Sequence, residues 1–328
     1  MKTQKPANER FLKHHAKKPS QKRIDKLSTR TISSFNKAAG YFYLIFNHVT
    51  IGPLLGYLSR VVFKFFIPQY IQNIHLRHTP VKHVDHKLDE AVPFDPSHLD
   101  TYMGFITFYI RPQLLFGKRY GYFNGGQYPN EFMRYLKVIY DEAYRFYSYS
   151  FTTTYRPKSD LKSIKKLHNA DPHYMCVPSL HVSLVCACYG YFRMCFNREG
   201  FTEKEKNLWL TEIRKEGISI IESVLYLKQH SVNCIPAAMY MITSLCPEMF
   251  SLQDAVDFIG DLFKDAKDIS EENKKAIFDH IQFTYERFLL EGIQSSDWMD
   301  PLKHWLDDYE SIVPFYADEE EVKKALKK

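Results

Sequence analysis

The sequence is poor in the residues that mark fibrous, disordered and disulfide-bonded proteins. Its 328 residues include 13 glycines, 16 prolines and six cysteines, which excludes a collagen, a disordered chain and a small disulfide scaffold. No two cysteines form a Cys-x-x-Cys pair, so we expect buried thiols rather than disulfides or a zinc site. A hydrophobic fraction of 45% allows a substantial core in one large domain or two small ones.

The N-terminal sequence does not fit a secretory signal peptide, because no apolar segment follows closely on a short basic stretch. Residues 1–30 instead hold 10 Lys or Arg against Glu9 and Asp25. We assign residues 1–35 to a basic N-terminal arm, which is typical of a solvated tail or of the cytoplasmic flank of a first membrane helix. No recognised nucleic-acid-binding module follows this arm, so we expect no nucleic-acid partner.

Six apolar runs suggest membrane helices in residues 36–250. Residues 38–59 are 22 positions without Lys, Arg, Asp or Glu, enough for a helix to cross the roughly 30 Å hydrocarbon core. The other runs are 101–110 with 114–116, 146–154, 172–192, 217–227 and 229–247. We therefore predict an all-α fold, a six-helix membrane bundle; a soluble helical bundle with these runs as its core is the alternative.

The distribution of Lys and Arg predicts the orientation of such a bundle. With a cytoplasmic N-terminus, the second-to-third and fourth-to-fifth connections are also cytoplasmic, and both carry Lys or Arg as the positive-inside rule requires. The resulting protein is integral and multi-pass, with both termini cytoplasmic. The ends of helices three and five and the start of helix four then meet on the extracytoplasmic or lumenal face.

Residues 251–328 have a different composition, with 19 Asp or Glu against 10 Lys or Arg. Ser251 and Asp254 form a capping-box variant ahead of an apolar stripe. A second helix is predicted to start after Ser270, with Glu271 in its first turn. We assign 251–328 to an acidic, appended helical region that offers a surface to a protein partner.

Two motifs carry the chemistry. Residues 177–181 read Val-Pro-Ser-Leu-His where an apolar helix should begin, so the free amides of its first turn point at an anion beside His181. Residues 228–234 read Lys-Gln-His-Ser-Val-Asn-Cys at the mouth of another apolar run. There, Lys228 and His230 lie two apart at a junction, where a turn can aim both at one phosphate.

These motifs resemble those of the type 2 phosphatidic acid phosphatase superfamily, closest to its Pro-Ser-Leu-His and Lys-Gln-His branch, over residues 146–241. The resemblance implies that His230 is the nucleophile, forming a phosphohistidine, and that His181 is the general acid. It also implies that Arg156, Ser179 and Lys228 hold phosphate oxygens. Two histidines in different environments can divide these roles, and cations stabilise the phosphoryl charge.

Three positions depart from the family pattern. Tyr149 stands where the first motif has Lys, and Val224 stands where the third motif has Arg. Cys234 occupies the position of the Asp that orients the nucleophilic histidine, and a neutral thiol is a poor replacement. Glu222 is a carboxylate that could replace it.

The predicted substrate is a lipid phosphate or a similar phosphomonoester, hydrolysed at a membrane without a metal or another cofactor. The Pro-Ser-Leu-His form also looks like that of sphingolipid synthases, so a lipid headgroup phosphotransferase is one alternative. A catalytically inactive membrane scaffold is another. A histidine-rich connection suits zinc by residue type, but its irregular spacing favours a solvated loop; its members are His75, His78, His83 and His86, with Asp85 and Asp89.

Overall fold

The structure is a computed structural model that describes residues 18–325 and is mostly helical. The helices, in chain order, are α2 (Gln21–Leu27), α3 (Lys37–Phe46), α4 (Ile51–Arg60), α5 (Ile67–Asn73), α6 (Leu99–Met103), α7 (Phe105–Ile110), α8 (Gln113–Tyr120), α9 (Gln127–Tyr149), α10 (Lys162–Ala170), α11 (Leu180–Arg198), α12 (Glu203–Tyr226), α13 (Cys234–Leu245), α14 (Leu252–Asp261), α15 (Glu271–Ile293), α16 (Asp300–Asp308) and α17 (Glu319–Ala325). A π-helical segment, η1 (Val61–Phe66), joins α4 to α5, and three short 3-10 turns are η2 (Lys87–Ala91), η3 (Pro96–His98) and η4 (Asn124–Gly126). The predicted all-α class is confirmed.

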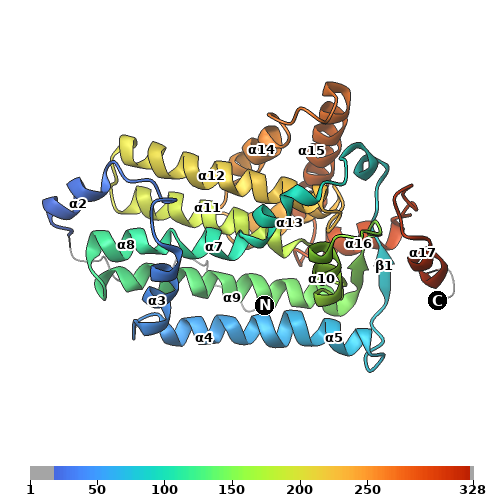
Figure 1. The fold of residues 1–328 in the computed structure, drawn as a ribbon, viewed down its shortest axis with the longest axis horizontal. Helices are drawn as coiled ribbons and strands as arrows, with labels where there is room; N and C mark the ends of the chain where they lie inside the picture. Colours follow the sequence, from blue (N-terminus) through green and yellow to red (C-terminus); the bar gives the residue numbers. More distant parts are fainter. Residues whose placement is uncertain (1–17, 326–328) are drawn as a thin grey trace.

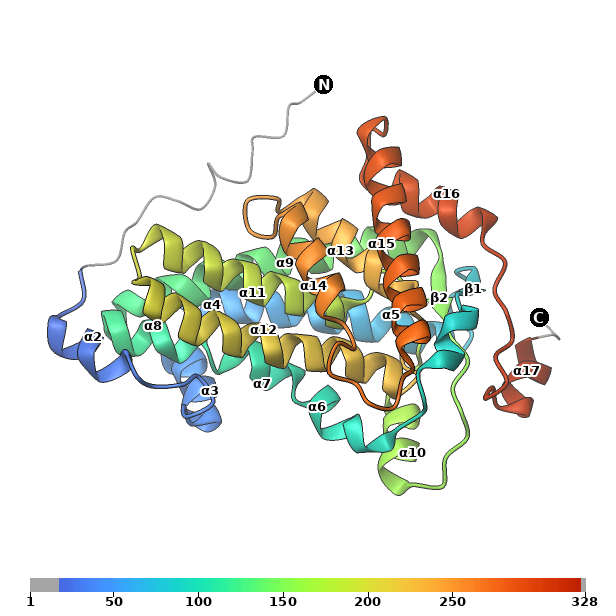
Figure 2. The ribbon, with the colours of Figure 1, turned by 90° about the horizontal axis from the view of Figure 1, so that it is seen from above.

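The long helices lie lengthwise and form a layered bundle (Figure 1). Helix α11 packs on α9, α12 and α13, and α4 packs on the outer side of α9. Helix α15 crosses the bundle direction and covers α13 (Figure 2). Because α9, α11 and α13 lie inside this arrangement, their apolar side chains form the core rather than an outer surface.

The first predicted membrane run, residues 38–59, is wrong as a single helix. Buried Asn47 and Thr50 break it, because their side chains bind backbone groups in place of the helical ladder. Asn47 donates to Tyr122 O over 2.6 Å, and Thr50 Oγ1 donates to Leu44 O over 2.5 Å. The longer apolar helix lies further along the chain, where α4, η1 and α5 run continuously over Ile51–Asn73.

The other five runs also differ from membrane-length helices. The run 101–116 is divided among the three short helices α6, α7 and α8, and the run 146–154 contains the end of α9 and a strand. The run 172–192 is helical only from Leu180, and the run 217–227 is the end of α12. The run 229–247 contains α13, which has only 12 residues. Within residues 18–325, Ile51–Asn73 is the one helix long and apolar enough to cross a membrane. This supports membrane association but does not establish a six-helix membrane bundle.

A small parallel sheet holds the site segments together. Strand β1 (Val81–His83) pairs with β2 (Phe151–Thr153), which follows α9 directly. Thr152 also forms a bridge to Met175 in the approach to α11. The sheet therefore joins the histidine-rich connection, the Arg156 segment and the Pro-Ser-Leu-His segment.

The first described helix and the C-terminal helices α14 to α16 pack on the bundle. Residues 1–17 of the predicted basic arm lie outside the described residues, whereas α2 packs on α8, and Ile32 N donates to Glu212 Oε2 over 2.6 Å. In the C-terminal region, Ser251 caps α14 with Asp254 in a capping box, and α15 begins at Glu271, both as predicted. Helix α15 packs on α13 and α16 packs on α15, so residues 251–308 extend the same core.

Candidate functional site

The N-terminus of α11 brings two predicted site residues to the middle of the fold. Ser179 is the N-cap, and its Oγ accepts a hydrogen bond from Val182 N over 3.4 Å. His181 lies in the first turn, as predicted. The segment before the helix is fixed by the Tyr147 hydroxyl, which donates to Pro178 O over 2.6 Å. The position of the helix start is thus set by the core.

His230 lies in the tight loop between α12 and α13. The backbone amides of Gln229 and His230 donate to Val224 O over 2.9 and 3.2 Å, which folds the loop back on the end of α12. The imidazole centroids of His230 and His181 are 5.7 Å apart, at an interplanar angle of 67°. The structure therefore brings together the two histidines that the sequence predicts as catalytic, from segments about 50 residues apart.

Two hydrogen bonds fix the orientation of the His230 ring. Its Nδ1 lies 3.2 Å from Cys176 O, and its Nε2 lies 3.2 Å from Ser179 Oγ. A carbonyl can only accept, so Nδ1 carries the proton and Nε2 of the neutral ring has a lone pair that accepts from the Ser179 hydroxyl. Burial, with His181 and His173 nearby, lowers the pKa of His230 well below its ordinary value. The ring is therefore held neutral, with the lone pair of Nε2 unprotonated.

Among residues 18–325, no carboxylate bonds to His230 in the way that the resemblance implies. Cys234 is buried at the first position of α13, and the Cys176 carbonyl occupies the orienting role at Nδ1. Glu222, the carboxylate considered from the sequence, points elsewhere, because its Oε1 accepts from Phe263 N over 2.6 Å. The orienting group is a backbone carbonyl, which a sequence motif cannot reveal.

Asp171 and His173 are site residues that the sequence analysis did not identify. Both line a small inner pocket together with His181 and His230. His173 N donates to Asp171 Oδ1 over 3.1 Å, and His173 Nε2 lies 2.7 Å from Thr154 Oγ1. Burial raises the pKa of Asp171, but the bonds to His173 and the charge of Arg156 outweigh it and hold this pKa below its ordinary value. The pocket thus contains a carboxylate anion.

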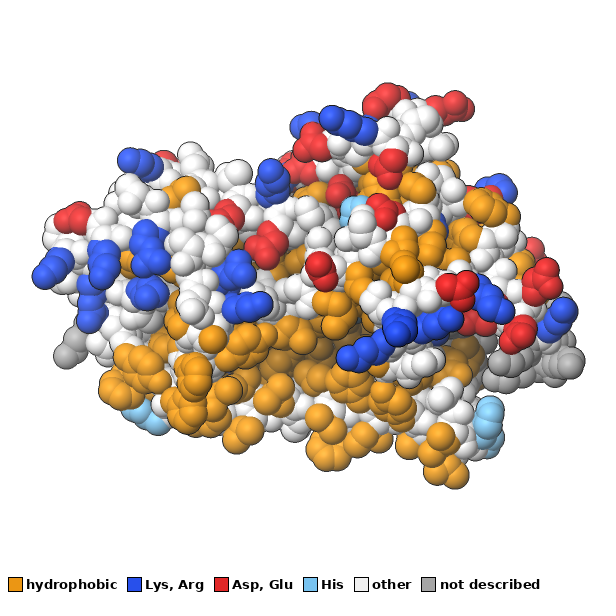
Figure 3. Space-filling model, viewed as in Figure 1, with side chains coloured by type: hydrophobic (Ala, Val, Ile, Leu, Met, Phe, Trp, Pro, Cys, Tyr) orange, Lys and Arg blue, Asp and Glu red, His pale blue; other side chains and the backbone are white. Residues whose placement is uncertain are grey.

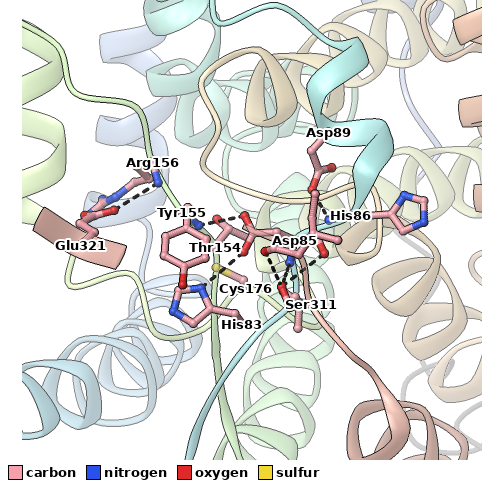
Figure 4. Close-up of polar contacts among 12 residues, drawn as sticks. His83, Asp85, His86, Asp89, Thr154, Tyr155, Arg156, Cys176, Ser311 and Glu321 are labelled. Atoms are coloured by element: carbon pink, nitrogen blue, oxygen red, sulfur yellow. Dashed lines mark hydrogen bonds and ion pairs between the residues drawn. The ribbon is translucent and has the colours of Figure 1, made fainter. Parts of the chain in front are cut away.

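Arg156 lies beside this carboxylate segment. Its Nη1 donates to Asp171 O over 3.4 Å, and its backbone amide donates to Glu321 Oε2 of α17 over 3.3 Å (Figure 4). The guanidinium is partly exposed and close enough to influence the pKa of both Asp171 and His173. Arg156 is thus the predicted phosphate-binding cation that lies nearest the pocket.

Lys228, the other predicted phosphate-binding cation, has different partners. It has a left-handed backbone with φ of 52°, and its buried Nζ donates to Asp89 O over 2.6 Å and to Val92 O. It therefore binds the carbonyls at the end of η2 rather than lining the pocket. Asp89 supports the same loop, because its Oδ1 accepts from Val232 N over 2.7 Å. Burial lowers the pKa of Lys228 and raises that of Asp89.

The inner pocket opens into a large apolar groove. The pocket itself has about 20 Å³ free, room for roughly one water molecule. The groove has about 520 Å³ and is lined mostly by apolar side chains of α3, α4, η1, α6 and α7. The two cavities share the lining residues Phe65, Tyr102, Asp171, Leu180 and His181. A long apolar ligand in the groove would thus place one end beside the two histidines.

The histidine-rich connection is exposed at His75 and His78, as expected for a solvated loop, but from His83 onward it is built into the fold. His83 stacks on Tyr155 and pairs with the buried Asp85, whose Oδ1 accepts from Tyr155 N over 2.9 Å (Figure 4). His86 caps η2. Among residues 18–325 no group of three or more His, Cys, Asp or Glu side chains is arranged to hold a metal ion.

The six cysteines are all free and buried, as predicted. Comparison with protein-family models, curated proteins and solved structures finds no match for this chain. Assignment of a function therefore depends on the residues and the geometry of the site.

Proposed function

We propose that this protein is a membrane-associated phosphatase that hydrolyses a lipid phosphate through a phosphohistidine intermediate. The observation that carries the proposal is the position of His181 and His230, whose ring centroids are 5.7 Å apart where a 520 Å³ apolar groove meets the inner pocket. The groove would hold an acyl chain and the pocket end the phosphate. The resemblance to the type 2 phosphatidic acid phosphatase superfamily supports the same assignment.

The first chemical step uses the two histidines in different protonation states. His230 Nε2 attacks phosphorus, forming an N–P bond while the bond to the lipid oxygen breaks. Burial lowers the pKa of His181 to about 4, so the substrate itself, as the phosphate monoanion, must bring the proton that His181 passes to the leaving oxygen, and the lipid departs as an alcohol. In the second step neutral His181 takes a proton from water, which attacks phosphorus and releases phosphate from His230. No metal takes part in this scheme.

Ser179 and Asp171 support His230 rather than react. The Ser179 side chain is fully buried and does not line the pocket, whereas His230 does. Because the Ser179 hydroxyl binds Nε2 of His230, the phosphate must displace this hydrogen bond before Nε2 can attack. Asp171 stabilises positive charge that develops on the histidines. The pocket has room for about one water, so a bound phosphate must displace side chains that line it. Arg156, which donates to the backbone of the pocket residue Asp171, is the nearest of the predicted phosphate-binding cations.

Membrane association rests on Ile51–Asn73, which is 23 residues long and contains an 18-residue stretch with a mean hydropathy of 1.3. At 1.5 Å per residue this helix is about 34 Å long, comparable with the hydrocarbon core. The multi-pass arrangement, with cytoplasmic termini and an extracytoplasmic or lumenal site, stays a prediction.

A second candidate function is a lipid-binding membrane scaffold without catalysis. Three observations favour it: Lys228 is engaged by backbone carbonyls, Tyr149 donates to Asp307 over 2.5 Å, and Cys234 replaces the orienting Asp. These changes leave Arg156 as the cation near the pocket among the predicted phosphate-binding residues.

The test is phosphate release from a panel of phosphatidic acid, lysophosphatidic acid and isoprenyl phosphate by purified protein in detergent, with and without EDTA. We expect EDTA-resistant release that His230→Ala abolishes and that the control His98→Ala preserves, because His98 stacks on Tyr226 outside the pocket. A parallel reaction with diacylglycerol as acceptor detects phosphate transfer to an alcohol, the phosphotransferase alternative. No turnover with either acceptor would support the scaffold.

A further inference from the structure

One long face of the molecule is apolar and has no protein partner within residues 18–325. Figure 3 shows hydrophobic side chains gathered over α3, α4 and α5, below a more polar upper half. Phe63 on η1 is 64% exposed and Phe46 on α3 is 67% exposed. An exposed patch of this extent marks a surface for a membrane or a partner. Its most exposed members are Phe42, Phe46, Leu55, Phe63, Ile74 and Leu76.

The opposite side of the bundle is polar along its length. Helix α12 is buried on one side, and its exposed stripe consists of Glu203, Lys204, Asn207, Thr211 and Lys215. A bundle that crossed a bilayer lengthwise would place part of this stripe in hydrocarbon, where charged groups are costly. The polar stripe therefore favours an orientation in which α12 stays in water.

The apolar face itself carries charges that suit the interface better than the bilayer centre. Arg60 and Lys64 lie in the middle of Ile51–Asn73, and both pair with Asp141 of α9 over 3.3 and 2.7 Å. All three side chains remain about one-third exposed. A helix that lies in the interface keeps such a cluster near the headgroups, with its apolar side in the acyl region.

Helix α10 places positive charge at the edge of this face. Residues 158–166 contain four exposed lysines and one aspartate, Asp160, which pairs with Lys165 over 3.0 Å. The Tyr70 hydroxyl of α5 donates to Ala170 O over 2.7 Å, which ties the end of α10 to the apolar helix. Ala170 and Asp171 also line the groove. Blue side chains beside the hydrophobic area in Figure 3 agree with this placement.

We propose that the face formed by α3, α4, η1 and α5 lies in the plane of one leaflet of an anionic bilayer, with the lysines of α10 among its headgroups. In this orientation the groove takes a lipid chain directly from the leaflet, while the inner pocket lies near headgroup level. The inference deepens the proposed function by defining how substrate enters, but docking itself does not require catalysis. In this arrangement the bundle inserts into one leaflet instead of crossing the bilayer with six helices.

The test uses single cysteines, added to a chain whose own six are replaced by serine or alanine, in sealed membranes with a membrane-impermeant maleimide. His48 and His78 are exposed and lie on either side of Ile51–Asn73. We expect H48C and H78C to react from the same side of the membrane and T211C to react from that side too. Reaction of H48C and H78C from opposite sides, or protection of T211C until detergent is added, would overturn the proposal.

Vesicle flotation tests the lipid contact separately from activity. The triple variant K162Q/K165Q/K166Q should reduce the partition of the protein to phosphatidylglycerol vesicles by about tenfold or more, since each basic residue near the surface contributes to binding of anionic lipid. The control K204Q/K215Q, on the polar side, should bind as the wild type does. Equal partition of both variants would overturn the proposal, because the lysines of α10 would then not contact lipid. Disulfide-linked dimers of F63C in membranes would also overturn it, because a second copy of the chain would then cover the apolar face. A wild-type protein that floats with the vesicles but releases no phosphate would reject the proposed function and leave the membrane orientation intact.

Discussion

Replacement of Asp89 tests how the His230 loop is held. The Asp89 carboxylate accepts from Val232 N over 2.7 Å and from His86 N over 2.8 Å, and its charge stabilises the buried cation of Lys228. Hydrogen bonds to a charged group contribute roughly 1.5–3 kcal/mol each, and removal of one partner from a buried charged pair costs about 3–5 kcal/mol. We therefore expect Asp89→Ala to lower the free energy of unfolding by about 3–5 kcal/mol.

Thermal unfolding in detergent, followed by tryptophan fluorescence at pH 8, measures this loss. That pH is above the value of about 7 to which burial raises the pKa of Asp89. The expected fall in Tm is roughly 4–7 °C for a chain of this length. Asp89→Asn keeps one acceptor and should lose less. The control Asp95→Ala removes the cap of the short η3 turn, where Asp95 is partly exposed, and should cost about 1 kcal/mol or less. Equal stability of Asp89→Ala and the wild type would refute this account of the loop.

Three further predictions follow from the site and the core. Asp171→Asn should lower kcat by about tenfold and also lower KM for a lipid phosphate, because the carboxylate stabilises the cationic intermediate but repels the anionic substrate; a rise in KM with unchanged kcat would contradict this role. Burial raises the pKa of Asp89 and Glu222 to about 7, but it lowers the pKa of a larger set of histidines, which are His86, His168, His173, His181, His230 and His280. Below about pH 6.5 the unfolded chain therefore binds more protons than the folded one, and stability should fall as the pH falls. A Tm that rises between pH 7.5 and 5.5 would reverse the sign of this linkage. The six buried thiols should react with maleimide only after denaturation, and fast labelling of the native protein would show that the core around α11 and α13 opens.

The local signals in the sequence predicted helix starts well. Ser179 and Ser251 cap the helices that follow them, and α15 begins at Glu271 as expected. Such signals succeed because a cap acts through backbone groups within a few residues of itself. They also located His181 and His230 at two helix mouths, which the fold then brings together.

The longer-range features depended on contacts that the sequence does not show. The run 38–59 lacks charge, but Asn47 and Thr50 bind backbone carbonyls across a turn and end the helix there. Length and absence of charge in a run could not separate a membrane helix from a core helix. Helix α13 is as free of charge as the run 38–59, yet it lies buried beneath α15. Exposure in the folded chain, rather than hydropathy alone, distinguishes Ile51–Asn73 from the others.

The composition of the site was only partly predictable for the same reason. Lys228 follows the family spacing but turns toward η2, since its left-handed backbone and the η2 carbonyls direct it away from the pocket. Asp171 and His173 enter the pocket through a loop with no periodic pattern, so no motif pointed to them. Cys176 contributes a carbonyl, a group that every residue has.

Direct detection of the covalent intermediate tests the central claim. The protein would be mixed with a lipid phosphate carrying radiolabelled phosphate, quenched in alkali during turnover and digested for peptide mapping. The account predicts an acid-labile, alkali-stable label on the peptide that contains His230, absent from His230→Ala and retained in His98→Ala. Phosphate release without label at His230, or undiminished release by His230→Ala, would contradict it.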